Sequence, residues 1–404
     1  MLDGKLIWTG TQPKHWIDEV LIEEFSGRNI VLAASRDDRV YMWDMGGNLR
    51  WEKLQSEPGV FKRIVNTLIG LTGGKDVHMS VGEFKGQKVI ISGSDDLYIS
   101  DENGKQLWDS QESIKFVEDI TFGKLNGRKV IICGCEEHPT GGNIFVWDVN
   151  GKLMWKGEKM NYPIKSVNIG RLDGREVVVA GGGDNLQKEI AKESYHFGED
   201  VIVETKTQSF GGGLQVYDKE GEPLWAGSKL KEIKGWVEHT IIEAIDGKDV
   251  ILVGVGRENW KRDDGGVYVL NNKGEIILEY KEPMDWIWKV GSADLAGKDC
   301  IIAVCGDSTL FVFDLEGDTI WKSNEAEAGV NDFVLREFHG EKYIIVSSAD
   351  HHVYIWNEQG ELVWKGTGPT KSLFCVDAKV IGDKMYVVAG SLDSDVYVWE
   401  LKGD

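Results

Sequence analysis

A twelve-residue phrase recurs along this chain, and its clearest copy is VYIWNEQGELVW, from Val353 to Trp364. In each full copy, a β-branched and aromatic run reaches Asp or Asn, and Gly follows three residues later. Trp stands four residues after that Gly in most copies, and Leu278 takes its place in one of them. Because Gly adopts the left-handed turn conformation at no steric cost, the phrase predicts a β-hairpin. A large ring at one repeat position indicates a packing role between neighbouring units.

A second pair of strands is expected upstream of each hairpin. In the typical unit, an amphipathic strand reaches a turn at His339 and Gly340, and an apolar strand runs from Tyr343 to Val346. Apolar runs of this kind are typical of strands covered on both faces. Four strands per unit, eight units and no helical pattern predict an all-β chain, a single eight-bladed β-propeller over residues 1–404 with four antiparallel strands per blade.

The eighth copy of the phrase is split between the two ends of the chain. GKLIW at Gly4 to Trp8 supplies its second half, and VYVWELKG at Val396 to Gly403 supplies its first half. We therefore expect the N-terminal strand to complete the last blade and to close the ring. Such pairing leaves fewer free strand edges and holds both termini in place.

Two known families share parts of the phrase. SRDDRVYMWD, SADHHVYIWN and SLDSDVYVWE resemble the Ser-x-Asp…Trp-Asp element of WD-repeat propellers. The Gly-x-x-x-Trp ending resembles the tryptophan-docking repeat of quinoprotein-like propellers, although the spacing from Asp to Gly is one residue shorter here. Both resemblances imply a propeller fold and leave the activity open. A quinone cofactor site of the second family would bring adjacent cysteines, whereas Gly134 separates Cys133 from Cys135.

Composition narrows the range of partners and compartments. The net charge of −21 argues against a nucleic-acid backbone and against an anionic membrane surface. The five cysteines lack a paired metal-binding spacing and mostly lie in or beside apolar runs, which predicts buried free thiols in a reducing compartment. With no signal-like N-terminus and no apolar run of membrane length, we expect a cytoplasmic protein. Removal of a leader would place it outside the cell instead.

Insertions interrupt particular blades, at about 52–76, 134–143, 181–213 and 254–266. The last three fall between the second and third strands of blades three, four and five, so they must emerge on one face of the ring. Function on rigid scaffolds concentrates on elaborated loops, although loop length also drifts at little energetic cost. In the last insertion, Trp260 stands among Arg257, Lys261 and Arg262, and this group could hold an acidic peptide or a carboxylated sugar. A solvated loop with one packed Trp is the other interpretation.

The innermost strands begin at that same face. Alignment on their turn glycines gives one residue per blade at the channel mouth: Glu19, His78, Asp119, Ser166, His239, Lys289, Asp332 and Phe374. Three positions earlier stand aromatic residues that would form a rim: Trp16, Phe116, Trp236 and Trp286. This polar ring is either a hydrated channel lining, a recognition site for a peptide or sugar, or a catalytic or metal site.

The sequence favours a binding or scaffolding propeller that is not an enzyme. We expect its partner, a protein, a peptide or a carbohydrate, on the face that carries the long loops. The alternatives are a carbohydrate-active or quinoprotein-like enzyme with its site at the channel mouth, and a structural subunit of a larger assembly. No catalytic or phosphate-binding motif occurs, and His78 and His239 lie three blades apart, so we expect no catalytic residue, bound metal or cofactor.

Overall fold

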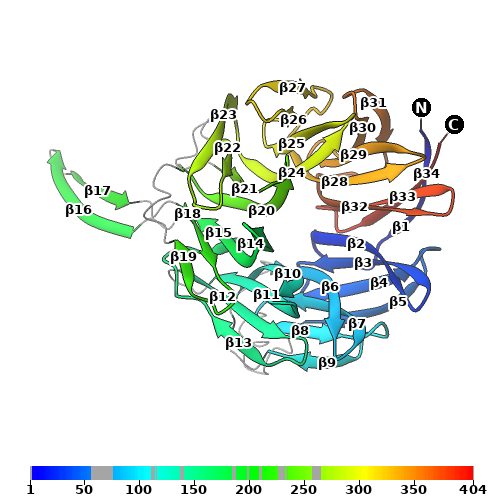
Figure 1. Ribbon diagram of the computed structural model, residues 1–404, viewed down its shortest axis with the longest axis horizontal. Coiled ribbons are helices and arrows are strands. Elements are labelled where there is room, and N and C mark those ends of the chain that lie inside the picture. Colours follow the sequence, from blue (N-terminus) through cyan, green and yellow to red (C-terminus); the bar gives the residue numbers. More distant parts are fainter. Residues whose placement is uncertain are drawn as a thin grey trace.

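The computed structural model describes residues 2–55, 76–110, 114, 116–136, 141–183, 188–197, 200–208, 212–225, 233, 235–256 and 265–403. Eight four-stranded antiparallel sheets stand around a central axis, as the blades of a propeller (Figure 1). No helix occurs among these residues. The predicted all-β, eight-bladed architecture is therefore confirmed.

Each blade is a meander of four strands that runs from the channel outward. The inner strands are β2 (Ile17–Phe25), β6 (His78–Phe84), β10 (Val117–Leu125), β14 (Ile164–Leu172), β20 (Val237–Ile245), β24 (Ile287–Leu295), β28 (Val330–Phe338) and β32 (Leu373–Ile381). The second strands are β3 (Arg28–Ser35), β7 (Gln87–Gly93), β11 (Arg128–Glu136), β15 (Arg175–Gly183), β21 (Lys248–Val255), β25 (Lys298–Cys305), β29 (Glu341–Ser348) and β33 (Lys384–Ser391).

The outer half of each blade comes from the recurring phrase. The third strands are β4 (Arg39–Asp44), β8 (Leu97–Ser100), β12 (Gly142–Asp148), β18 (Gly212–Tyr217), β22 (Gly265–Leu270), β26 (Leu310–Phe313), β30 (Val353–Asn357) and β34 (Val396–Lys402). The outermost strands are β5 (Leu49–Leu54), β9 (Gln106–Asp109), β13 (Leu153–Lys156), β19 (Pro223–Trp225), β23 (Ile276–Met284), β27 (Thr319–Lys322), β31 (Leu362–Gly366) and β1 (Asp3–Gly10).

Ring closure follows the split copy of the phrase. β1 pairs antiparallel with β34, with Asp3 opposite Lys402 and Gly10 opposite Val396. The N-terminal strand thus forms the outer edge of the last blade, and the two termini lie side by side (Figure 1). The predicted closure agrees with this sheet.

The turn of the phrase has a simple physical basis. In blade seven, the Asn357 Oδ1 atom accepts hydrogen bonds from the amides of Gln359 and Glu361. Gly360 follows with a φ of +80°, a conformation that L side chains rarely adopt. The same arrangement recurs at Asp44 and Gly47 in blade one. Short polar side chains hold the turn, and Gly permits it.

The glycines of these turns also receive the repeat tryptophans. Trp8 from β1 lies on Gly47 of the next blade, where an added Cβ would come within 2.8 Å of the indole. Its Nε1 donates to the carbonyl of Met45 at 3.1 Å. Trp51 repeats this contact on Gly104 and donates to the carbonyl of Glu102. The packing role predicted for the repeat tryptophans is confirmed at these junctions between blades, which we call seams.

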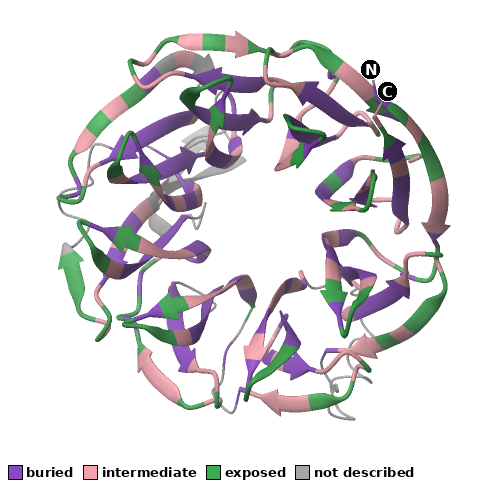
Figure 2. Cartoon of the chain, turned by 45° about the vertical axis from the view of Figure 1, so that its right-hand side comes forward, coloured by how far each residue is buried: buried purple, intermediate pink, exposed green. Residues whose placement is uncertain are grey.

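The apolar core is divided among the seams rather than placed inside single blades. Each buried apolar cluster joins residues of two neighbouring blades, as with Val31 and Trp43 of blade one and Val388 and Val398 of blade eight. Buried residues accordingly line the sides where blades face one another, and exposed residues lie on the outer edges (Figure 2). A single blade cannot bury its own faces, so stability requires a closed ring.

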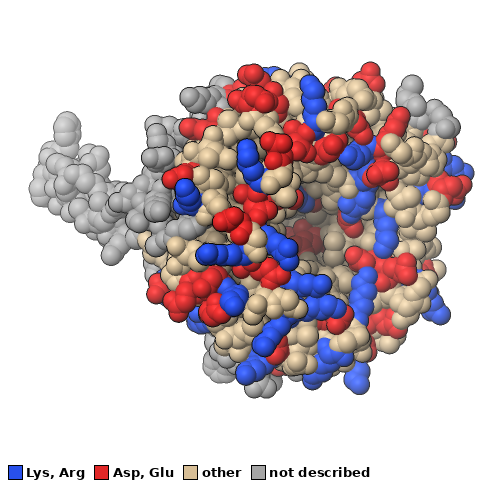
Figure 3. Space-filling model, in the orientation of Figure 1, with Lys and Arg blue, Asp and Glu red and all other residues tan. Residues whose placement is uncertain are grey.

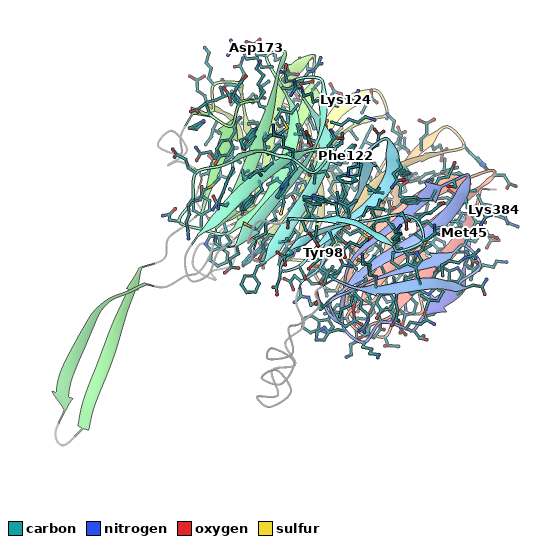
Figure 4. All side chains as sticks on the ribbon, turned by 90° about the horizontal axis from the view of Figure 1, so that it is seen from below. Met45, Tyr98, Phe122, Lys124, Asp173 and Lys384 are labelled. Carbon is teal, nitrogen blue, oxygen red and sulfur yellow. The ribbon has the colours of Figure 1, made fainter. Side chains whose placement is uncertain are left out.

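Two ends of the ring differ in their connections. Tight two-residue turns join inner to second strands at one end, and both residues of the Ser26–Gly27 turn have positive φ. At the other end, part of the predicted insertion 134–143 is strand rather than loop. β11 and β12 continue into this range, and Gly134 pairs with Ile144. The insertion 181–213 contains the hairpin of β16 (Lys188–Phe197) and β17 (Asp200–Gln208). This hairpin projects from the end opposite Lys124, which lies near the end of β10, and the turn residue Asp173 (Figure 4).

Candidate functional site at the channel mouth

The ring encloses a central opening, with acidic and basic side chains interspersed around it (Figure 3). The predicted polar ring lies on the inner strands, at the end from which the long loops emerge. Glu19, Asp119 and Asp332 occupy equivalent register positions, opposite Ala34, Gly134 and Ser347 respectively. Ser166, His239 and Lys289 occupy the same position in their blades, and His78 is the first residue of its strand.

Blade eight departs from the predicted ring. Its inner turn has positive φ at Gly382 and not at the residue before it, whereas the other turns place Gly second. The glycine alignment is consequently shifted by one residue in this blade. Cys375, opposite Gly390, takes the ring position, and Phe374 occupies the neighbouring bulge. The prediction of Phe374 in the polar ring is therefore wrong.

Several ring side chains connect their inner strand to the inner strand of the next blade. Asp119 accepts a hydrogen bond from the Val167 amide at 2.7 Å, and Asp332 accepts one from the Val376 amide at 3.0 Å. Equivalent bonds run from Met79 to Glu19, from Thr240 to Ser166 and from Val290 to His239. Each inner strand is an edge of its sheet, so the amides that point away from the sheet have no neighbouring strand to bond to. Much of the polar ring thus has a structural role, because it satisfies these amides.

Charged pairs surround the ring in blades one and two. The Arg36 guanidinium contacts the carboxylates of Asp18 at 2.7 Å and Asp76 at 3.0 Å. Burial raises the pKa of Asp18 to about 6, although Arg36 opposes the shift. The His78 imidazole lies 3.5 Å from the Glu19 carboxylate. Burial alone would lower the pKa of His78, but Glu19 and other nearby carboxylates raise it to about 9.

Blades three and four continue this charged region. Lys165 donates to Glu118 at 2.7 Å. Burial raises the pKa of Asp119 to about 6, while its hydrogen bond from Val167 and the charge of His78 act in the opposite direction. A carboxyl group that titrates near neutral pH and a charged imidazole therefore share one side of the mouth.

The opposite side of the mouth has a different electrostatic character. Lys289 donates to Asp332 at 2.7 Å and lies over the ring of Phe333. Burial and the charge of Lys289 together lower the pKa of His239 to about 3. His239 is thus neutral at physiological pH, and its Nδ1 faces the Val290 amide as an acceptor.

The predicted aromatic rim divides into exposed and packed members. Trp16 is 39% exposed with Arg36 over its ring, and Phe116 is 40% exposed. Phe116 also has a φ of +49°, which is rare for a bulky residue and is found mostly where function or packing enforces it. Trp236 is buried and meets Trp286 edge-on at 5.1 Å. Only part of the predicted rim is accessible to a ligand.

One aromatic residue at the mouth, Trp288, escaped the sequence analysis, and another, Phe374, was assigned to the neighbouring position. Trp288 stacks on Trp286 at 5.2 Å, and Phe374 is 37% exposed. Both occupy a β-bulge immediately before the ring position, where one extra residue turns a side chain out of the regular alternation. The same bulge recurs in seven blades at the residue that precedes the ring position, and it is visible in the strand pairing rather than in the sequence.

Arg257, Trp260 and Arg262 lie outside the described residues. Within the described part of the chain, no three His, Cys, Asp or Glu residues come together as metal ligands. The five cysteines are buried and free, and burial raises the pKa of Cys133 and Cys375. No helix in the described part is long and apolar enough to span a membrane.

Comparison with known proteins supports the class defined by this geometry, the eight-bladed β-propeller. Residues 300–404 match a family model described as the lambda-carrageenase beta-propeller domain. A solved structure titled "Structure of Dos1 propeller" superposes with a TM-score of 0.65 at 11% identity, over 98% of this chain and 94% of that chain. No curated protein matches. Since 1124 solved chains match in structure, this likeness shows the fold alone.

Proposed function

We propose that this chain is a non-catalytic recognition propeller that binds a protein partner at the channel mouth, on the face of the long loops. The observation that carries the proposal is the position of its exposed aromatic side chains. Among described residues, the Trp and Phe side chains in the exposed class are Trp16, Phe116 and Phe374. All three belong to the starts of inner strands, whereas most other exposed apolar side chains lie on the outermost strands. Aromatic residues are enriched where proteins bind partners.

The charges at the mouth favour a partner segment with basic residues. Asp18 and Glu19 follow Trp16 closely in the chain, Glu118 follows Phe116, and all three act on the charge of His78, while Asp119 adds a further carboxyl group. Arg36 and Lys165 neutralise part of this charge through Asp18 and Glu118. A cationic side chain of the partner would be attracted to these carboxylates, much as Arg36 is attracted to Asp18 and to the ring of Trp16. The net charge of −21 would also speed the approach of a basic segment.

A carbohydrate partner is the second candidate function. It is favoured by the match of residues 300–404 to a propeller domain named for a carrageenase. Exposed aromatic faces beside hydrogen-bonding groups suit a sugar ring as well as a peptide. In this case the chain would bind a polysaccharide at the same mouth.

The test compares two double variants on a basic-peptide library and on a glycan array. Trp16→Ala with Phe374→Ala removes aromatic residues at the mouth, whereas Leu49→Ala with Leu362→Ala removes exposed apolar residues from outer strands. We expect the first variant to bind its ligands at least about tenfold more weakly, because central aromatic residues contribute about 2 kcal/mol or more, and we expect the second variant to bind normally. Losses confined to peptides support the first candidate, and losses confined to glycans support the second. Equal binding by all three proteins would refute a mouth-binding function.

A further inference from the structure

One seam of the propeller lacks its docked indole. At the seam of blades five and six, Leu278 stands where other blades carry Trp, and it faces Gly317. An added Cβ at Gly317 would meet only the Leu278 Cδ1 atom, at 3.2 Å, within 4 Å. At Gly360, by contrast, an added Cβ would lie 2.6 Å from the Trp321 ring. The surface of the turn glycine is therefore less covered at this seam than at the neighbouring seam of blades six and seven.

Tyr280 compensates for part of the missing ring. Its hydroxyl donates to the carbonyl of Asp314 at 2.5 Å, much as the Trp51 indole donates to the carbonyl of Glu102. Its ring also lies 4.1 Å from the Phe313 ring. Tyr280 is buried, however, and it does not line the space in front of Leu278. The seam is thus stabilised on its inner side and remains open on its outer side.

The open side is a pocket of about 780 Å³. The corresponding pocket at the seam of blades one and two, which contains Trp51, measures about 410 Å³. The apolar walls of the pocket at the Leu278 seam include Val250, Val269, Ile277 and Ile320. Ile277 and Ile320 are 53% and 42% exposed, so the walls are accessible from solvent. The larger volume falls within the range of small-molecule sites.

Charge at the rim of this pocket is predominantly negative. Four carboxylates and two ammonium groups line it, a net charge of −2: Asp246, Asp299, Asp314, Glu316, Lys248 and Lys298. Lys248 lies 4.0 Å from Asp246, which it partly neutralises. A cationic group on a bound ligand would therefore be attracted to the rim, and an anionic group would be repelled.

We propose that this seam binds a small ligand composed of a flat aromatic ring and a cationic group. The ring takes the place over Gly317 and Leu278 that docked indoles such as those of Trp51 and Trp321 hold at their seams, and the cation lies among the rim carboxylates. The site is separate from the channel mouth, because it involves outer strands and tight turns rather than the long-loop end.

The test uses tryptamine, an indole with an ammonium group, as the probe in ligand-observed saturation-transfer NMR of the full chain. We expect Leu278→Trp to weaken tryptamine binding by at least about tenfold, because the chain's own indole then fills the pocket. Leu362→Trp adds the same side chain at an exposed position of β31 and serves as the matched control, which should bind as the wild type does. Ile320→Lys adds a cation to an exposed wall and should also weaken binding by at least about threefold. This second variant keeps the test valid if Leu278→Trp fails to fold.

Indole-3-acetate tests the role of charge and should bind more weakly than tryptamine, by about two- to fivefold. Absence of tryptamine binding at millimolar concentration would overturn the proposal. So would binding that Leu278→Trp and Ile320→Lys both leave unchanged. If only Trp-containing peptides bind this seam, and free tryptamine does not, the site accepts a partner protein and the small-ligand proposal is wrong.

Discussion

The two sides of the ring behave differently at the same two repeat positions, in one case through the surroundings of a shared residue type and in the other through a different residue. At the ring position, His78 in blade two lies beside carboxylates, and His239 in blade five lies beside Lys289. At the docking position, Trp51 covers a turn glycine, whereas Leu278 leaves one less covered. Equivalent backbone positions therefore do not imply equivalent chemistry. Neighbouring blades determine whether an imidazole is charged and whether a seam is filled.

The largest expected difference between the two sides concerns the seams. Trp51→Leu should lower the free energy of unfolding by about 2 kcal/mol, because it removes a docked ring and leaves a cavity. Leu278→Trp should instead change stability by less than about 1 kcal/mol in either direction, because Tyr280 already makes the inner contacts. Urea unfolding of both variants and the wild type measures this. Equal losses in the two variants would show that Leu278 is as tightly packed as Trp51.

An intermediate effect is expected from the charge of His78. Its folded pKa of about 9 exceeds the ordinary value of 6.5. The charged imidazole therefore stabilises the fold fully below pH 6.5, and this stabilisation is lost as the pH rises from 6.5 through 9. We expect the free energy of unfolding to fall by about 1–2 kcal/mol over that window, because the side chain is partly exposed and solvent screens the interaction. His78→Gln should flatten the decline, measured by urea unfolding at pH 6.5, 8 and 9. An unchanged decline in the variant would assign it to other groups.

The smallest expected effect concerns His239. Burial is the larger cause of its depressed pKa, and Lys289 is the second cause. Lys289→Met should therefore raise the pKa of His239 from about 3 while leaving it below 6.5, because the ring stays buried. Imidazole nitrogen shifts in NMR titrations report this directly, and His78 in the same spectra provides the comparison. A pKa at or above 6.5 in the variant would make Lys289, rather than burial, the dominant cause.

Much of the fold could be predicted because its signals are local and repeated. Asp or Asn followed by Gly encodes a hairpin turn, and Trp364 at a fixed distance encodes the contact with the next blade. The split copy at Gly4 to Trp8 predicted which strand closes the ring. The exception in blade eight arose from a turn whose Gly382 stands first instead of second, which shifts every upstream residue by one register position.

The candidate site could be predicted only in outline. The sequence assigned polar residues to the channel mouth, but it did not show that Asp119 and Asp332 accept amide bonds from the following blade. It also treated Trp16 and Trp236 alike, whereas the structure exposes the first and buries the second. Exposure depends on loops and neighbouring blades, which lie far away in the sequence.

By itself, the sequence determined the number of blades, their strand order and the manner of closure, because turn chemistry and residue periodicity act over a few residues. Tertiary structure alone decided the opposite charge states of His78 and His239, the separate roles of the rim aromatics and the open seam at Leu278. Each of these depends on which side chains of the adjacent blade come within a few ångströms, and burial and electrostatic interaction are set by that spatial proximity.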